Sequence, residues 1–244
     1  MYQFNMSIDK KLSHWFSSIE KVFSMRLKAL DGVVATKEHA KRIEISVACE
    51  SNRKSDAVKI IRKTLLEMYL TVVKYDYLED MISLPNVCEN SYKILLHTLV
   101  AFDREAESEI IENQLKLGDY LSLDGFFNFR LRELRTRWDE IAQLASSNAV
   151  YLGNDETLNE LLKFLMSAVT PKIQKLSITV LPNIYNIKGE YNKSNFEIKI
   201  NSAEKLMIYL INIAPLELIL EGEFLDKQLY KRIISIFDGK SASG

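Results

Sequence analysis

The sequence predicts an α+β fold in which helices predominate: a helical core, a small N-terminal β-hairpin and a small C-terminal α/β unit. The 244 residues include only eight glycines and four prolines, which indicates few sharp turns and long continuous elements. Apolar residues recur at spacings of three and four through most of the chain, as in amphipathic helices. In a few short stretches they alternate with polar residues, as in half-buried strands.

These patterns divide the chain into three segments. Residues 1–50 form a helix and a β-hairpin, residues 51–170 form the helical core, and residues 171–244 form the small α/β unit. No linker rich in proline, serine or glycine separates the segments. We therefore expect them to pack as one or two compact units.

The first segment begins with a helix that Ser7 or Asp9 can cap and that Asp31-Gly32 ends. Its apolar residues lie on one helical face: Leu12, Trp15, Phe16, Ile19, Val22, Phe23, Leu27 and Leu30. The alternation of Ile43, Ile45 and Val47 then predicts a strand, with residues 33–36 as its hairpin partner across 37–40.

Four helices are predicted for the core. They cover residues 56–83, which Pro85 ends, then 89–117, 124–149, and 156–169, for which Asp155 offers a cap. In the second of these the C-terminal half is mostly charged, so Glu105, Glu107, Glu109 and Glu112 are expected on a solvated face.

The third core helix contains the stretch DGFFNFRLRELRTRW at residues 124–138, dense in aromatic and arginine residues. On a helical wheel one apolar stripe emerges: Phe127, Leu131, Leu134, Trp138, Ile141 and Ala145. Phe126 and Phe129 make a second, smaller patch, and Arg130 and Arg137 border the stripe. The aromatic residues are therefore expected in a core. For Arg130 we expect a packed stem and a guanidinium bound to a carboxylate or a carbonyl.

The C-terminal segment changes from helical to alternating character. Leu176, Ile178 and Val180 predict a strand, and residues 196–201 predict its hairpin partner, with a loop around Gly189. Ser202 caps a helix that Pro215 stops, and a short apolar strand and a closing amphipathic helix follow.

The charge balance argues against a strong field over the whole molecule. Lys and Arg number 32 and Asp and Glu number 33, for a formal net charge of −1. General attraction to nucleic acid or to an anionic membrane is therefore not expected, and any basic patch must be local. No secretory pattern and no apolar run of about 20 residues is seen, so we expect a cytoplasmic protein without a membrane partner.

Familiar catalytic and binding motifs are missing. The sequence has no GxxxxGK[ST], no GxGxxG and no GxSxG, and its three histidines lack metal-ligand spacing. Cys49 and Cys88 form no CxxC pair, so both are expected as small buried residues in a reducing compartment. We expect no catalytic residue, no metal and no cofactor.

Two residues remain as candidate binding residues. Arg130 stands at the border of the apolar stripe, and His97 lies inside the apolar run ILLHTLVAF, where a hydrogen-bonded, largely buried histidine is the ordinary interpretation. Arg130 could be buried beside a carboxylate or exposed in a cleft, and the sequence leaves both open.

The second half of the chain resembles a known family. Gly125-Phe126 followed by Phe129-Arg130-Leu131, and Leu210–Pro215 leading into a strand and a closing helix, are similar to the YtxC-like family of sporulation proteins from endospore-forming Firmicutes. The resemblance runs from Leu121 to about Phe237 and implies no activity, cofactor or catalytic residue. Members continue into a cysteine-bearing tail, whereas residues 237–244 contain no cysteine, so no metal or redox role of that tail is carried over.

The sequence thus favours a non-enzymatic cytoplasmic protein that acts through contacts with an unknown protein partner in sporulation. The alternative is a nucleic-acid or nucleotide-binding protein that uses local basic helix faces. An enzyme would need residues to converge from separate elements, which a sequence does not reveal. The oligomeric state is left open.

Overall fold

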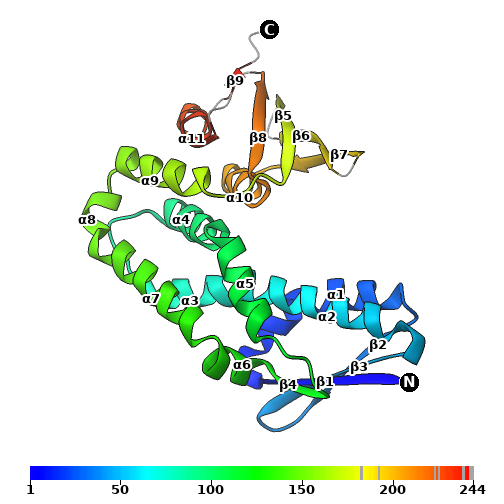
Figure 1. The fold of residues 1–244 in the computed structure, drawn as a ribbon. Helices are drawn as coiled ribbons and strands as arrows, with labels where there is room; N and C mark the ends of the chain where they lie inside the picture. The colour runs from blue at the N-terminus through cyan, green and yellow to red at the C-terminus, as the bar shows by residue number, and fades with distance from the viewer. Residues whose placement is uncertain (182–183, 192, 223, 225, 238–239, 242–244) are drawn as a thin grey trace. The chain divides into compact units, whose positions relative to one another are not determined.

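A computed structural model describes residues 1–181, 184–191, 193–222, 224, 226–237 and 240–241. It is an α+β structure in which helical residues outnumber strand residues, as predicted. The chain forms two compact units (Figure 1). Unit 1 comprises Met1–Met81 and Glu105–Ala142, and unit 2 comprises Ile82–Arg104 and Gln143–Gly244. The predicted core segment, residues 51–170, is therefore divided between them.

Unit 1 combines a four-stranded sheet with helices. Its strands are β1 (Tyr2–Asp9), β2 (Val33–Glu38), β3 (Arg42–Cys49) and β4 (Tyr120–Ser122). Its helices are η1 (Lys10–Leu12), α1 (Ser13–Lys28), η2 (Ser51–Arg53), α2 (Lys54–Met68), η3 (Tyr69–Val73), α3 (Lys74–Met81), α5 (Arg104–Gln114), α6 (Leu123–Arg130) and α7 (Arg132–Ser147), of which Arg104 and the end of α7 belong to unit 2.

The sheet of unit 1 has the order β2-β3-β1-β4, and the pairing of β2 with β3 is one part of it. The central strand β1 was not predicted, although Phe4, Met6 and Ile8 alternate and are fully buried. β1 runs antiparallel to β3 and parallel to β4, so a strand more than 110 residues later in the chain completes the sheet. Helices α1 and α2 cover one face (Figure 1).

The Arg42 side chain ties β3 to the start of α6. Its Nη2 donates to Asp124 Oδ1 at 2.6 Å and to Ser7 Oγ at 2.8 Å. Ser122 is the N-cap of α6 and accepts from the Gly125 amide. Burial opposes the ionisation of Asp124, but the hydrogen bonds and charge of Arg42 outweigh it, so the pKa of Asp124 is lowered. Asp124-Gly125 is thus the entry turn of α6, fixed from a distant strand.

The predicted helix 124–149 is two helices. The break is at Leu131, whose backbone (φ −97°, ψ 34°) leaves the α-helical region between α6 and α7. Leu131 and most of the apolar stripe are nevertheless buried, as expected for a core. The prediction that Phe126 and Phe129 form a second apolar patch is wrong, because Phe126 is buried and Phe129 is 70% exposed. The prediction assumed one continuous helix, and the chain breaks at Leu131.

Two other predicted helices are also interrupted. Residues 54–81 are helical throughout, but Tyr69–Val73 forms a π-helical turn between α2 and α3. The helix predicted for 89–117 divides into α4 (Glu89–Ala101), which belongs to unit 2, and α5. Asp103 separates them with a positive φ of 57°.

A buried ion pair lies at the centre of unit 1. The Lys74 Nζ is 2.7 Å from Glu107 Oε1, and the two side chains are 0% and 1% exposed. The Trp138 Nε1 donates to the same Oε1 at 2.8 Å. The prediction that Glu107 lies on a solvated face is therefore wrong. The charged half of the predicted helix turns inward here because α3 and α7 supply a cation and an indole donor.

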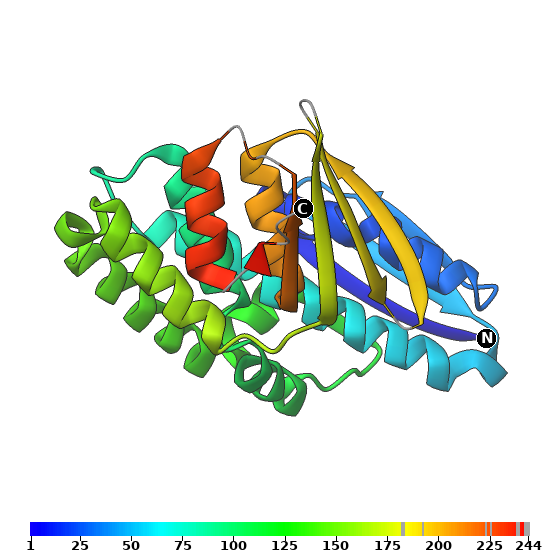
Figure 2. The same ribbon diagram turned by 90° about the horizontal axis from the view of Figure 1, so that it is seen from above.

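Unit 2 contains α4, α8 (Ala149–Leu152), α9 (Asp155–Ser167), α10 (Ala203–Ile213) and α11 (Lys227–Phe237). Its strands are β5 (Ile173–Leu181), β6 (Ile184–Tyr191), β7 (Ser194–Ile200), β8 (Pro215–Glu221) and β9 (Lys240–Ser241), in the order β7-β6-β5-β8-β9. The N-cap of α9 is Asn154, one residue before the predicted Asp155, whereas Ser202 caps α10 as predicted. Helices α10 and α11 lie beside each other next to the strands (Figure 2).

Strand β6 corrects the predicted hairpin of unit 2. The segment expected to be a loop around Gly189 is a strand that pairs antiparallel with both β5 and β7. Gly189 sits in this strand because a Cβ there would lie 2.9 Å from both Leu176 Cδ1 and Phe196 Cζ. A glycine that reads as a turn signal in sequence thus makes room for two neighbouring apolar side chains.

We predict that Lys74→Met destabilises unit 1 by about 3–5 kcal/mol, because it leaves the Glu107 carboxylate buried without its cation. Adding Glu107→Gln to Lys74→Met is expected to recover part of that loss, since a neutral amide can still accept from Trp138. Urea unfolding followed by tryptophan fluorescence measures both effects in unit 1, which contains both tryptophans. A double variant less stable than Lys74→Met would contradict the prediction.

Candidate functional site

The two residues singled out in the sequence lie in different units. Arg130 is exposed at the end of α6 in unit 1, and its side chain forms no hydrogen bond or ion pair with another described residue. His97 lies on α4 in unit 2 and is half-buried. Burial lowers the pKa of His97, and the nearby negative charge of Glu204 opposes this shift. Neither residue lines the hollow described next.

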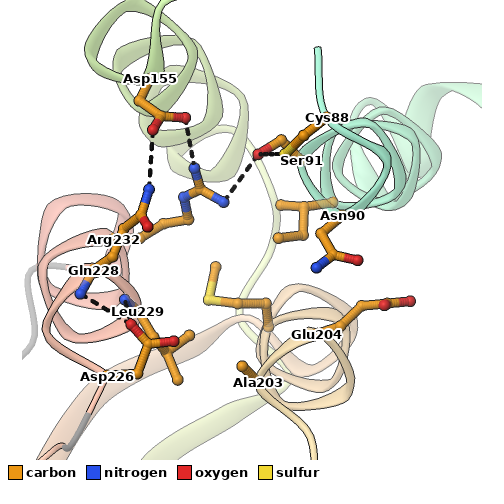
Figure 3. A pocket seen from close by; sticks show the side chains of 12 residues that line it. Cys88, Asn90, Ser91, Asp155, Ala203, Glu204, Asp226, Gln228, Leu229 and Arg232 are labelled. Atoms are coloured by element: carbon orange, nitrogen blue, oxygen red, sulfur yellow. Dashed lines mark hydrogen bonds and ion pairs between the residues drawn. The ribbon is translucent and has the colours of Figure 1, made fainter.

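The starts of four helices enclose a hollow of about 190 Å³ in unit 2 (Figure 3). Helices α4, α10 and α11 contribute residues of their first two turns, and α9 contributes its first residue. The lining residues are Cys88, Asn90, Ser91, Ile94, Asp155, Ala203, Glu204, Met207, Asp226, Gln228, Leu229 and Arg232. No sequence spacing brings these four helix starts together, so the sequence could not predict this pocket.

Arg232 links three of these helices. Its Nη2 donates to Asp155 Oδ1 at 3.0 Å and its Nη1 to Ser91 Oγ at 3.2 Å (Figure 3). Its Nε donates to Asn159 Oδ1 at 3.0 Å. Gln228 donates to the second oxygen of Asp155 at 3.0 Å. With its donors directed to α4 and α9, Arg232 holds the helices together and defines one wall of the pocket.

The carboxylates of the pocket have a structural role. Asp155 and Glu204 lie in the first turns of α9 and α10, and Asp226 caps α11 by accepting from the amides of Gln228 and Leu229. Negative charge at a helix N-terminus is stabilised by the helix dipole. The described residues contain no group of His, Cys, Asp and Glu that could hold a metal ion.

Cys88 is a cysteine in the lining of the pocket. It is exposed, so the prediction of burial is confirmed for Cys49 and wrong for Cys88. The Cys88 Sγ lies 3.2 Å from Ser91 Oγ, and hydrogen bonding by Ser91, helped by the positive charge of Arg232, lowers the pKa of the thiol. No histidine lines the described pocket, so the thiolate has no partner there for general-base chemistry.

A second candidate surface is the free side of β7. This strand is at the edge of its sheet, and no other described strand pairs with its outer side. Phe196, Ile198 and Ile200 alternate with Asn195, Glu197 and Lys199, so the two kinds of side chain lie on opposite faces. Ile198 is 38% exposed. An edge of this kind presents backbone donors and acceptors to a further strand.

Comparisons of this chain with protein-family models, with curated proteins and with solved structures find no match. Within the described residues, no helix is both long and apolar enough to cross a bilayer.

We predict that Cys88 is alkylated by iodoacetamide much faster than Cys49 in the folded protein, with a pH midpoint below that of an ordinary thiol. Ser91→Ala should move the midpoint upward, because the hydrogen bond that stabilises the thiolate is lost. Mass spectrometry of the two cysteine peptides over a pH series measures this. Equal rates for the two cysteines, or a midpoint unmoved by Ser91→Ala, would contradict the prediction.

Proposed function

We propose that this chain is a non-enzymatic cytoplasmic protein that acts through protein–protein contacts at the β7 edge. In this proposal the small α/β unit expected over residues 171–244 is the part of the chain that binds. The observation that carries the proposal is the open edge of β7, seven residues long and apolar on one face. Addition of an extended segment to such an edge is a common mode of recognition.

The composition of β7 supports binding there. The strand contains no proline, which is a common means of blocking an edge. Its backbone provides hydrogen bonds to an added strand, and its alternating side chains provide selectivity. Ile198 adds exposed apolar surface at the centre of the edge.

The resemblance to the YtxC-like sporulation family adds a biological setting to this proposal. Its C-terminal part, residues 210–237, includes the end of α10 and all of β8 and α11 in unit 2. A role in the sporulation programme therefore belongs to the proposal and rests on that resemblance alone.

The nucleic-acid alternative has less support. Of the aromatic side chains between residues 124 and 138, Phe126, Phe127 and Trp138 are buried and cannot stack on bases. On strands β5 to β8, the polar face of the unit 2 sheet carries three lysines together with four glutamates: Lys175, Lys188, Lys199, Glu190, Glu197, Glu217 and Glu221. This mixture gives no basic track for a phosphate backbone.

We predict that Ile198→Lys abolishes partner binding, because it places a charge in the centre of the apolar row of the edge. Proteins crosslinked to the wild-type chain in sporulating cells should be lost or reduced at least tenfold with this variant, as measured by quantitative mass spectrometry.

The matched control is Val33→Lys, at an exposed position of the edge strand β2 in unit 1. It adds the same charge to another edge and should leave the crosslinked proteins unchanged. Equal recovery of partners by wild type and Ile198→Lys would overturn the proposal.

A further inference from the structure

We propose that the strand that adds to β7 is β7 of a second copy of this chain, antiparallel about a two-fold axis at Ile198. This inference rests on the proposed function, because it names the partner of the same edge. It is carried by the order of side chains along β7, Phe196-Glu197-Ile198-Lys199-Ile200, which is complementary to itself when reversed.

The geometry of a symmetric pair limits the registers. A two-fold axis that relates antiparallel strands is normal to the sheet, and directly opposite side chains point to the same face. The axis must therefore pass through a residue position. With the axis at Ile198, Glu197 lies opposite Lys199 of the second copy, Phe196 lies opposite Ile200, and Ile198 lies opposite itself.

Charge selects this register over its neighbours. An axis at Glu197 would place two glutamates opposite each other, and an axis at Lys199 would do the same with two lysines. Like charges directly opposite destabilise a strand pair, whereas opposite charges stabilise it by a few tenths to about 1 kcal/mol. The axis at Ile198 is thus the one of the three that gives two attractive charge pairs and no repulsive one.

The neighbouring strand β6 continues the same pattern. Glu197 lies opposite Lys188, with Nζ to Oε1 at 3.9 Å, and it accepts from Asn186 Nδ2 at 2.8 Å. In the proposed pair, Lys188, Glu197 and the second copy's lysine alternate in charge across adjacent strands. On the opposite face, Ile187 lies beside Ile198, so the pair aligns four isoleucines in one row.

The edge strand β2 of unit 1 does not have this self-complementary order of charged side chains. Strand β2 is the edge of the unit 1 sheet, with the sequence Val33-Val34-Ala35-Thr36-Lys37-Glu38. An axis at Ala35 would place Val33 opposite Lys37, and an axis at Thr36 would place Val34 opposite Glu38. Both of these central registers set an apolar side chain against a charge, so neither has the opposite-charge pairing that the axis at Ile198 gives in β7.

The expected association is weak. A single pair of seven-residue strands is small beside the roughly 1,200–2,000 Å² buried in stable complexes. We therefore expect a monomer–dimer equilibrium with a Kd in the micromolar range or weaker, visible in sedimentation at high protein concentration.

Charge exchange tests the register. Glu197→Lys and Lys199→Glu each create repulsion between copies, so each variant alone should remain monomeric at concentrations where the wild type dimerises. An equimolar mixture of the two should form a heterodimer, and the double variant should dimerise again, because both restore opposite charges across the axis. Circular dichroism of each variant checks that it is folded. A mixture and a double variant that both stay monomeric would overturn the proposal.

A disulfide tests the position of the axis. In a Cys88→Ser background, Ile198→Cys should give a covalent dimer on mild oxidation, because antiparallel partners have Cα atoms about 4.5–5.5 Å apart, within disulfide range. Ile200→Cys should not, since its own counterpart is about 13 Å away along the strands. Failure of Ile198→Cys to crosslink would overturn the proposed axis. If the wild type stays monomeric while Ile198→Lys still loses crosslinked partners, self-pairing falls and the proposed function stands.

Discussion

Unit 1 depends on the burial of two opposite charges. Lys74 and Glu107 have no access to water, and they join α3 to α5, while Trp138 brings α7 to the same carboxylate. Transfer of either charge alone from water to this interior is costly, so each side chain is retained there only with the other. A π-helical turn immediately precedes Lys74, and the break at Asp103 precedes α5, which carries Glu107. Both interruptions therefore lie next to the helices that the Lys74–Glu107 ion pair joins.

Unit 2 is subject to a different constraint: an open sheet has edge strands whose outer backbone groups lack a strand partner. Its apolar strand residues, such as Leu176, Ile178 and Leu220, are buried, so one face of the sheet is satisfied within the unit. The helix starts around Arg232 are held by short polar bonds and first-turn carboxylates. Of the two edge strands described in unit 2, β9 has only two residues, so the long unpaired strand backbone is that of β7. The pocket is a polar junction between helices that contains the exposed Cys88, and the edge is the surface on which the proposed contact depends.

Local sequence patterns predicted many of the helices and strands. The features that the predictions missed depend on contacts between residues far apart in the sequence. The spacing of Leu12 to Leu30 and the cap at Ser202 were sufficient to find α1 and α10, because both signals act within a few residues. The strand at Gly189 was missed because the reason for that glycine lies in Leu176 and Phe196. Glu107 was placed in solvent because nothing near it in sequence shows Lys74. The pocket was missed for the same reason, since Cys88 and Arg232 lie 144 positions apart in the sequence and meet only through tertiary packing.

Charged side chains on edge strands commonly prevent pairing with other chains. On β7 the charges disfavour some pairing registers and favour another. A row of lysines would repel every incoming copy in every register. Glu197 and Lys199, with opposite signs two residues apart, repel in the registers centred on either of them and attract in the register centred between them. The same two side chains can therefore disfavour indefinite, mis-registered pairing and permit a single closed one. Because a two-fold pair consumes both edges, the association ends at two copies with respect to β7. An open edge of this kind is therefore compatible with pairing that stops at two copies.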